Sequence, residues 1–152
     1  MGERLVPGLH VATMVAVPIA SSLPWVRFEV PEGIRYFSCA GLVVVGVGLM
    51  GWTLQHLRGA TRPRISPVSP VLVTSGPFRF VRHPFYVGIA IVLLGTVVKV
   101  ASVIGLATWL LVHLTITLWR IRLEDRALER QFQDEWRAYA GRGGIRTGSR
   151  RG

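Results

Sequence analysis

The chain has 152 residues, of which 50% are hydrophobic and 17% are charged, and its formal net charge is +10. This length indicates a single domain, and the charged fraction is low for a soluble domain. The arginines lie in short polar segments between long apolar runs rather than in a basic stripe, which excludes a nucleic-acid-binding surface. The single cysteine, Cys39, excludes a disulfide framework.

Two apolar runs near the N-terminus are long enough to cross a bilayer, which takes about 18 residues or more. We expect spans over residues 9–26, which include Pro18 and Pro24, and over residues 34–57, which are rich in glycine. Prolines are tolerated in membrane helices, and small residues let such helices approach closely. The first run also resembles a signal peptide, because Arg4 precedes it and small residues occupy 20–22. Its length, Pro18 and the later spans favour a retained helix.

Two further apolar runs, at residues 85–98 and 101–121, predict a helical hairpin with Lys99 near its turn. The first of these is shorter than a usual span. Arginines crowd the segment 58–82 and the tail after residue 121, whereas the hairpin turn carries only Lys99. The positive-inside rule then places the 58–82 loop and both termini in the cytoplasm. The sequence thus predicts an all-α fold, an integral membrane bundle of about four transmembrane helices with a cytoplasmic C-terminal helix.

The polar segments between and after these spans have different characters. Residues 58–84 contain Pro63, Pro67, Pro70 and Pro77 ahead of Pro84 and predict an extended loop. Residues 122–140 predict a cytoplasmic helix, because Leu128, Phe132, Trp136 and Tyr139 recur at helical spacing. Residues 141–152 are rich in glycine and arginine and predict a disordered basic tail. We treat residues 1–152 as one membrane domain.

A first polar cluster lies where the third span begins. Proline is favoured in the first turn of a helix, so Pro84 predicts a helix start with His83 at the cap. Arg82 and His83 then lie at the positive end of the helix dipole, which suits an anion. Tyr86 lies one turn further on the side of His83, and Gly88 lets a ligand or another backbone approach. The alternative interpretation is that Arg82 reaches for the membrane interface and Tyr86 belongs to an aromatic belt.

A second polar cluster, Glu124 and Asp125, follows the fourth span. Neighbouring residues point about 100° apart on a helix, so the two acids suit hydrogen bonds to one ligand from different angles rather than a paired acid and base. The alternative is a surface ion pair between Glu124 and Arg120, four residues away. His10, His56 and His113 lie in separate runs without metal-ligand spacing, and we interpret them as packing residues, so no metal site is predicted.

The run from Gly76 to Gly88 resembles the signature of the isoprenylcysteine carboxyl methyltransferase family and its phospholipid methyltransferase relatives. The second cluster with the residues after it, from Glu124 to Tyr139, resembles that family's second motif, so the resemblance covers about half the chain. It implies a membrane methyltransferase that uses S-adenosylmethionine, bound at the cytosolic ends of the helices beneath the loop and the tail helix.

Residue by residue, the resemblance implies that the cofactor is bound by Arg82, His83, Pro84, Tyr86, Gly88, Glu124 and Asp125. Arg82 and His83 are also the catalytic candidates: Arg82 to steer an acidic acceptor or pair with the cofactor carboxylate, and His83 to bond the cofactor or act as a base. This chain has Asp125 where the family usually has a second glutamate, Gln133 where it has glycine, and Trp136 where it has tyrosine.

The methyl acceptor is a separate question. The resemblance implies a lipophilic partner: a prenylated protein carboxylate, a hydrophobic thiol or acid, or a lipid amine. The arginine-rich, lysine-poor composition is typical of a GC-rich bacterium, which indicates the bacterial inner membrane and disfavours prenylated proteins. Two other classes stay open, namely a membrane reductase related to the steroid reductases and a small multi-span protein without catalysis. The oligomeric state is left open.

Overall fold

The computed structural model describes residues 2–23, 26–60 and 71–142, and the regular secondary structure of this part is helical, with short loops and one isolated bridge between Arg27 and Ser102. The elements in chain order are α1 (Gly2–Ser22), α2 (Glu32–Ala60), η1 (Gly76–Arg79), α3 (Pro84–Val100), α4 (Val103–Ala107), η2 (Thr108–His113) and α5 (Leu114–Arg142). The predicted all-α class is confirmed. The predicted tail at 141–152 lies almost wholly outside the described residues, as do residues 61–70 of the predicted loop.

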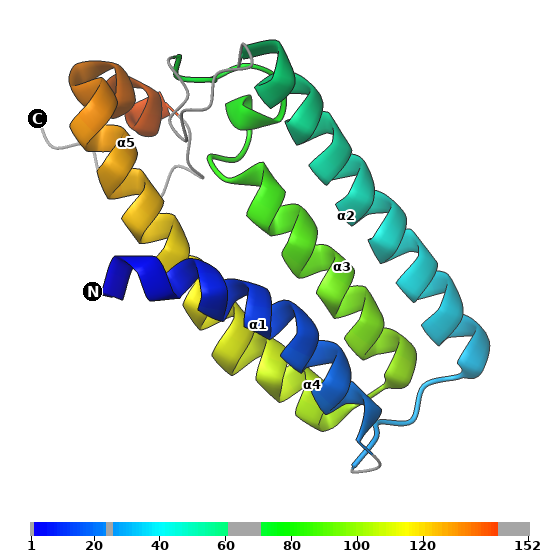
Figure 1. Cartoon of the computed structure of the whole chain (residues 1–152). Coiled ribbons are helices and arrows are strands. Elements are labelled where there is room, and N and C mark those ends of the chain that lie inside the picture. Colours follow the sequence, from blue (N-terminus) through cyan, green and yellow to red (C-terminus); the bar gives the residue numbers. More distant parts are fainter. Residues whose placement is uncertain (1, 24–25, 61–70, 143–152) are drawn as a thin grey trace, which may run out of the picture.

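The helices form two layers (Figure 1). α2 packs along α3 in one layer, and α1 packs against α4, η2 and the first part of α5 in the other, while also contacting α3. The core lies where α1 meets α3 and is formed by Val17, Ile89, Leu93 and Val97. The other faces of the helices expose many large apolar side chains, such as Phe37, Val44 and Leu111, a pattern that suits contact with lipid rather than water.

Glycines set how closely α2 and α3 approach. A Cβ atom on Gly46 would lie 2.7 Å from the carbonyl oxygen of Gly88, and one on Gly88 would lie 2.8 Å from that of Gly46. Each of the two positions therefore excludes any side chain. This is the close packing that small residues provide between helices in lipid. Gly46 belongs to the glycine-rich run 34–57, for which close helix packing was predicted.

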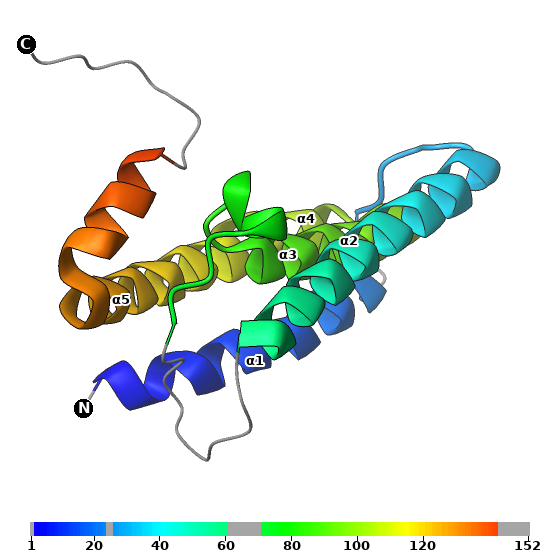
Figure 2. The same cartoon turned by 90° about the horizontal axis from the view of Figure 1, so that it is seen from above.

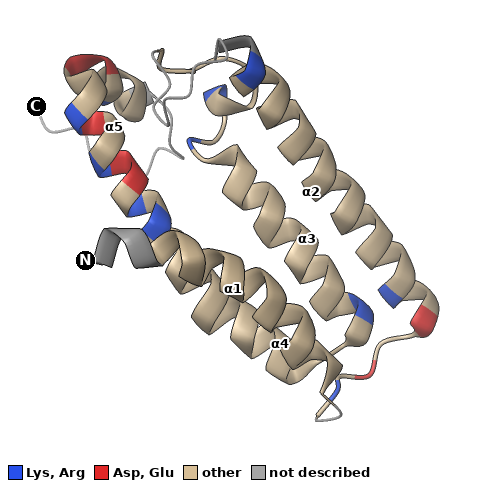
Figure 3. Ribbon diagram, in the orientation of Figure 1, with Lys and Arg blue, Asp and Glu red and all other residues tan. Residues whose placement is uncertain are grey.

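Two helices are long and apolar enough to cross a membrane, Glu32–Arg58 and Val103–Gly141, while Val6–Ser22 and Pro84–Val100 are shorter apolar helices. Among the described residues, the charged ones lie mainly at the ends of the bundle and along the outer part of α5 (Figure 3). The four-span arrangement with its orientation stays a prediction.

The fourth apolar run and the tail helix are continuous in the structure. α4, η2 and α5 follow one another from Val103 to Arg142 without an intervening loop. No proline or glycine occurs around residues 121 and 122, where the predicted span meets the predicted tail helix, so the sequence contains nothing that would end the helix there. At the other end of the chain, α1 stops at Ser22, four residues before the predicted limit of the first span.

α5 bends sharply at Gln133, whose φ of 44° and ψ of −110° are not helical. The bend turns the end of the helix toward η1 (Figure 2), where the Tyr139 hydroxyl donates a hydrogen bond to the carbonyl oxygen of Phe78 at 2.8 Å. Positive φ suits glycine and strains other residues. Gln133, the residue at which the tail turns, is thus at a position where glycine would fit with less strain.

We expect Gln133→Gly to stabilise the protein by about 1 kcal/mol, because glycine relieves the positive φ at an exposed position. Thermal unfolding of the detergent-purified protein measures this as a raised melting temperature. Arg130→Gly is the matched control, since it places glycine at an exposed, helical position of α5 and should destabilise the helix. An equal loss of stability in both variants would contradict strain at Gln133.

Candidate cofactor and active site

A cavity of about 480 Å³ opens between the end of α2, the segment before α3, the first turn of α3 and the outer part of α5. Its apolar walls include Leu54, Leu57, Leu72, Phe78, Leu128 and Phe132. Its polar lining includes Arg82, His83, Tyr86 and Glu124, together with Thr53, Gln131 and Tyr139. A cavity of this size, mostly apolar with a few convergent polar groups, is typical of a small-molecule site.

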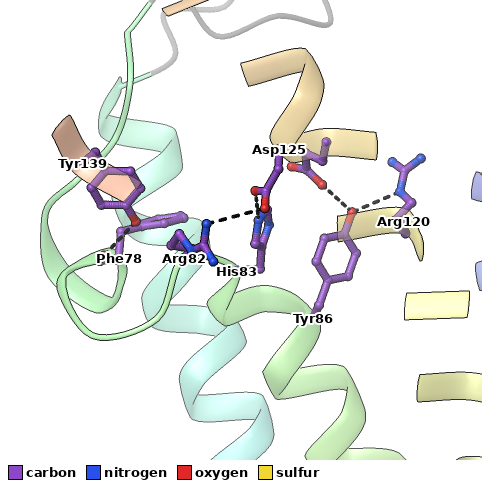
Figure 4. A network of polar contacts seen from close by, with 8 residues as sticks. Phe78, Arg82, His83, Tyr86, Arg120, Asp125 and Tyr139 are labelled. Carbon is purple, nitrogen blue, oxygen red and sulfur yellow. Dashed lines mark hydrogen bonds and ion pairs between the residues drawn. The ribbon is translucent and has the colours of Figure 1, made fainter. Parts of the chain in front are cut away.

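The start of α3 places His83 at this cavity. His83 is the N-cap residue of α3 and Pro84 is in its first turn, as the sequence predicted. The Nε2 atom of His83 lies 2.6 Å from Oδ1 of Asp125 on α5, and the His83 side chain is only 9% exposed. Nη1 of Arg82 lies 3.6 Å from Oδ2 of the same carboxylate, with the arginine 39% exposed. Asp125 therefore holds both catalytic candidates in place (Figure 4).

The Tyr86 hydroxyl links Glu124 to Arg120. Its hydroxyl donates a hydrogen bond to Oε2 of Glu124 at 2.8 Å and accepts one from Nε of Arg120 at 3.1 Å. The ion pair considered between Glu124 and Arg120 is thus bridged by the Tyr86 hydroxyl (Figure 4). The two adjacent acids reach different partners on α3, as expected from their angle on the helix.

The bent end of α5 forms one wall of the cavity. Trp136 and Tyr139 are buried and line the cavity. Burial raises the pKa of the Tyr139 hydroxyl above its usual value, and the Asp125 carboxylate adds to this while Arg82 opposes it. The hydroxyl therefore remains a hydrogen-bond donor to Phe78 at neutral pH, and this bond holds the end of α5 against η1.

The structure brings most of the predicted site residues together. Arg82, His83, Pro84, Tyr86 and Glu124 line the cavity, and Asp125 contacts two of them from α5. Gly88 is buried in the contact with α2 instead. The close packing of the two helices therefore requires a glycine at this position, and a role of Gly88 in cofactor binding stays a prediction.

Sequence reasoning missed several contributors to the site. Arg120 was considered only as an ion-pair partner, and the α2 wall formed by Thr53, Leu54 and Leu57 was not foreseen. No local pattern marks these α2 residues, because they line the site only through the packing of α2 against α3. Among the described residues, no three His, Cys, Asp or Glu side chains form a group able to hold a metal ion.

A family model described as PEMT, phospholipid methyltransferase, matches residues 34–135, about two thirds of the chain. The matched segment contains Arg82, His83, Tyr86, Glu124 and Asp125, whereas α1 and the last residues of α5 lie outside it. No curated protein and no solved structure matches the chain.

Proposed function

The chain belongs to the phospholipid methyltransferase family, and from this premise we propose that it is an integral-membrane methyltransferase that uses S-adenosylmethionine to methylate a lipophilic acceptor. The observation that carries the proposal is the cavity whose polar lining includes Arg82, His83, Tyr86 and Glu124. These are residues that the two sequence motifs supply from the start of α3 and from α5.

The chemistry of the cavity fits this cofactor. S-adenosylmethionine has a carboxylate and an ammonium at one end, ribose hydroxyls in the middle and a flat base at the other. Arg82 and the N-terminal turn of α3 offer positive charge for the carboxylate. Glu124 offers a carboxylate for the ammonium or the ribose. The aromatic side chains Phe78, Phe132 and Trp136 offer apolar surface for the base.

When bound, S-adenosylmethionine supplies a methyl group that is already activated on a sulfonium. The residues of the chain then have to bind, align the acceptor and exclude water, rather than form a covalent intermediate. We assign His83 to binding the cofactor, because its ring is nearly buried and is oriented by Asp125. Arg82 is more exposed, which also lets it steer an acidic acceptor.

We place the cavity at the cytoplasmic face of a four-span protein with both termini inside. The long apolar helices and the arginines at the cavity end of the bundle support this orientation. The acceptor then enters from the bilayer between the helices. A carboxylate, a thiol and a lipid amine are the candidate acceptor groups, and the bacterial inner membrane is the expected location.

The test is S-adenosylmethionine binding to the detergent-purified full chain, measured by titration calorimetry. We expect micromolar affinity for the natural sequence and a loss of about tenfold in Arg82→Ala, because a charge-assisted bond contributes about 1.5 kcal/mol or more. Arg79→Ala is the matched control, since Arg79 is an exposed arginine three residues away in η1. A folded protein that binds no S-adenosylmethionine would overturn the proposal, and titration with a nicotinamide cofactor would then test the reductase alternative.

A further inference from the structure

The two ring nitrogens of His83 have different surroundings. Nε2 lies 2.6 Å from Oδ1 of Asp125. The side chain makes no capping hydrogen bond to the backbone of α3, although His83 is the N-cap residue of that helix. Within the described part of the chain, Nδ1 has no hydrogen-bond partner. The protein therefore engages Nε2, and among the described residues nothing engages Nδ1.

Asp125 determines which nitrogen of the neutral His83 ring carries the proton. An ionised carboxylate can only accept hydrogen bonds, and Nη1 of Arg82 lies 3.6 Å from its second oxygen, Oδ2. Nε2 must therefore be the donor in the 2.6 Å contact with Oδ1. Since a neutral imidazole has one N–H, Nδ1 has a lone pair and no proton.

The lone pair of Nδ1 can be reached from the cavity. His83 lines the cavity, and its side chain is 9% exposed. In the described residues, the buried side-chain nitrogens and oxygens that lack a partner belong to His10 and Arg35. Nδ1 of His83 is not one of these buried atoms, so it lies on the accessible surface that borders the cavity.

This arrangement is that of a general base. A histidine is effective as a base when one nitrogen donates to a carboxylate and the other faces the reacting group, because the carboxylate fixes the tautomer and stabilises the imidazolium that forms. Asp125 provides this support from α5, and it keeps its own position through Arg82 (Figure 4).

We infer that Nδ1 of His83 is the general base of the methyl transfer, which takes a proton from an N–H or S–H group of the acceptor, and that Asp125 is its positioning residue. This rests on the proposed function and adds to the cofactor contact assigned to His83 there. The transferred methyl lies between cofactor and acceptor, whose reacting atoms are about 3–3.5 Å apart in a productive complex. One ring can therefore border both molecules.

In this step the proton of the N–H or S–H group passes to Nδ1, and the lone pair that remains on the acceptor atom forms the bond to the methyl carbon. The bond between that carbon and the sulfonium breaks, and its electron pair stays on the sulfur. His83 becomes an imidazolium that keeps its Nε2–H bond to Asp125 and then releases the Nδ1 proton to water. A carboxylate acceptor has no proton to lose, so it would not use this base.

The first test is nitrogen-15 spectroscopy of the detergent-purified full chain, labelled at histidine, at an alkaline pH where the ring is neutral. His83→Gln identifies the signals, because the glutamine amide can still donate to Asp125 while Nδ1 is removed. We expect Nδ1 at the position of a bare nitrogen and Nε2 at that of an N–H. Asp125→Ala should move the two signals toward each other as the tautomers mix, whereas Asp134→Ala, which removes a carboxylate that is 95% exposed, should not.

Three probes with the same alkyl chain then test what Nδ1 accepts, with S-adenosylhomocysteine present in place of a methyl donor. Dodecylamine and dodecanethiol offer N–H and S–H groups, whereas dodecanoate offers only lone pairs. The Nδ1 signal should move to lower frequency with a protic probe and not with dodecanoate. A protonated Nδ1 in the neutral ring, no movement with either protic probe, or an equal movement with dodecanoate overturns the inference.

Kinetics separate a base from a residue that only binds. His83→Gln should lower the rate of methyl transfer to a protic probe by about a hundredfold or more, while the affinity for S-adenosylmethionine falls far less. Free imidazole should restore part of the rate, because it can take the proton in place of the missing ring. Equal losses of rate and affinity, with no rescue by imidazole, overturn the inference. If no probe is methylated, the spectroscopic result decides alone.

Cofactor binding measured on the same preparations keeps the two proposals apart. If S-adenosylmethionine binds and the Nδ1 signal ignores the protic probes, the inference about His83 fails while the proposed function stands. If the signal responds and no cofactor binds, the methyltransferase proposal fails while the proton-accepting site at His83 stands.

Discussion

Replacing Asp125 with alanine is expected to weaken S-adenosylmethionine binding by about ten- to a hundredfold, the largest effect of any single substitution at the site. Its carboxylate contacts His83 at 2.6 Å and Arg82 at 3.6 Å. Hydrogen bonds to charged groups contribute about 1.5–3 kcal/mol, and about 1.4 kcal/mol is a tenfold change in affinity. The nearly buried His83 loses its orienting partner, so two cavity residues are affected by one change. Titration calorimetry of the purified protein measures the loss.

Two variants make this result specific. Asp134→Ala removes a carboxylate from the same helix that is 95% exposed and pairs only at the surface with Arg137, and it should leave the affinity unchanged. Asp125→Asn should fall between alanine and the natural residue, because an amide oxygen still accepts a hydrogen bond from Nε2–H of His83. If Asp125→Ala and Asp134→Ala bind equally well, Asp125 does not organise the site.

Glu124→Gln is expected to weaken S-adenosylmethionine binding by about tenfold and to leave the melting temperature nearly unchanged. Glutamine has the same size and its amide oxygen can still accept the Tyr86 hydroxyl, which lies 2.8 Å from Oε2 in the natural chain. What is lost is the negative charge in the cavity. Affinity from calorimetry and the melting curve of the same preparation separate these two effects.

The part of the cofactor that Glu124 binds can be read from a second ligand. S-adenosylhomocysteine lacks the transferred methyl group and the sulfonium charge but keeps the ammonium and the ribose. We therefore expect Glu124→Gln to weaken both ligands to the same degree. Glu129→Gln, an exposed position on α5 that pairs with Arg137, is the matched control. Unchanged affinity in Glu124→Gln would remove this residue from the site.

The local features of this chain could be read from its sequence because they depend on near neighbours. Apolar runs marked the helices, and Pro84 marked the start of α3 with His83 at its cap. The spacing of Arg82, His83 and Tyr86 within one turn placed them at one helix end, where the structure has them lining one cavity. The all-helical class and the family followed from the same short segments.

Contacts between helices could not be read in this way. Which acid meets which partner depends on how α5 lies against α3: Glu124 bonds to Tyr86, and Asp125 to His83. From the sequence, the expected partner of Glu124 was Arg120 on the same helix, because a single segment indicates only which residues are neighbours along that helix. The Tyr86 hydroxyl lies between them only because α3 packs nearby.

The amino-acid sequence by itself determined where helices form, which polar residues gather at the start of α3 and on α5, and which family the chain joins. The tertiary structure alone decided that Gly88 packs against Gly46, that α5 turns at Gln133, and that His10 meets His113 across 103 positions of sequence. The reason is physical: helix propensity and capping act over a few residues, whereas packing brings together groups whose separation along the chain carries no signal.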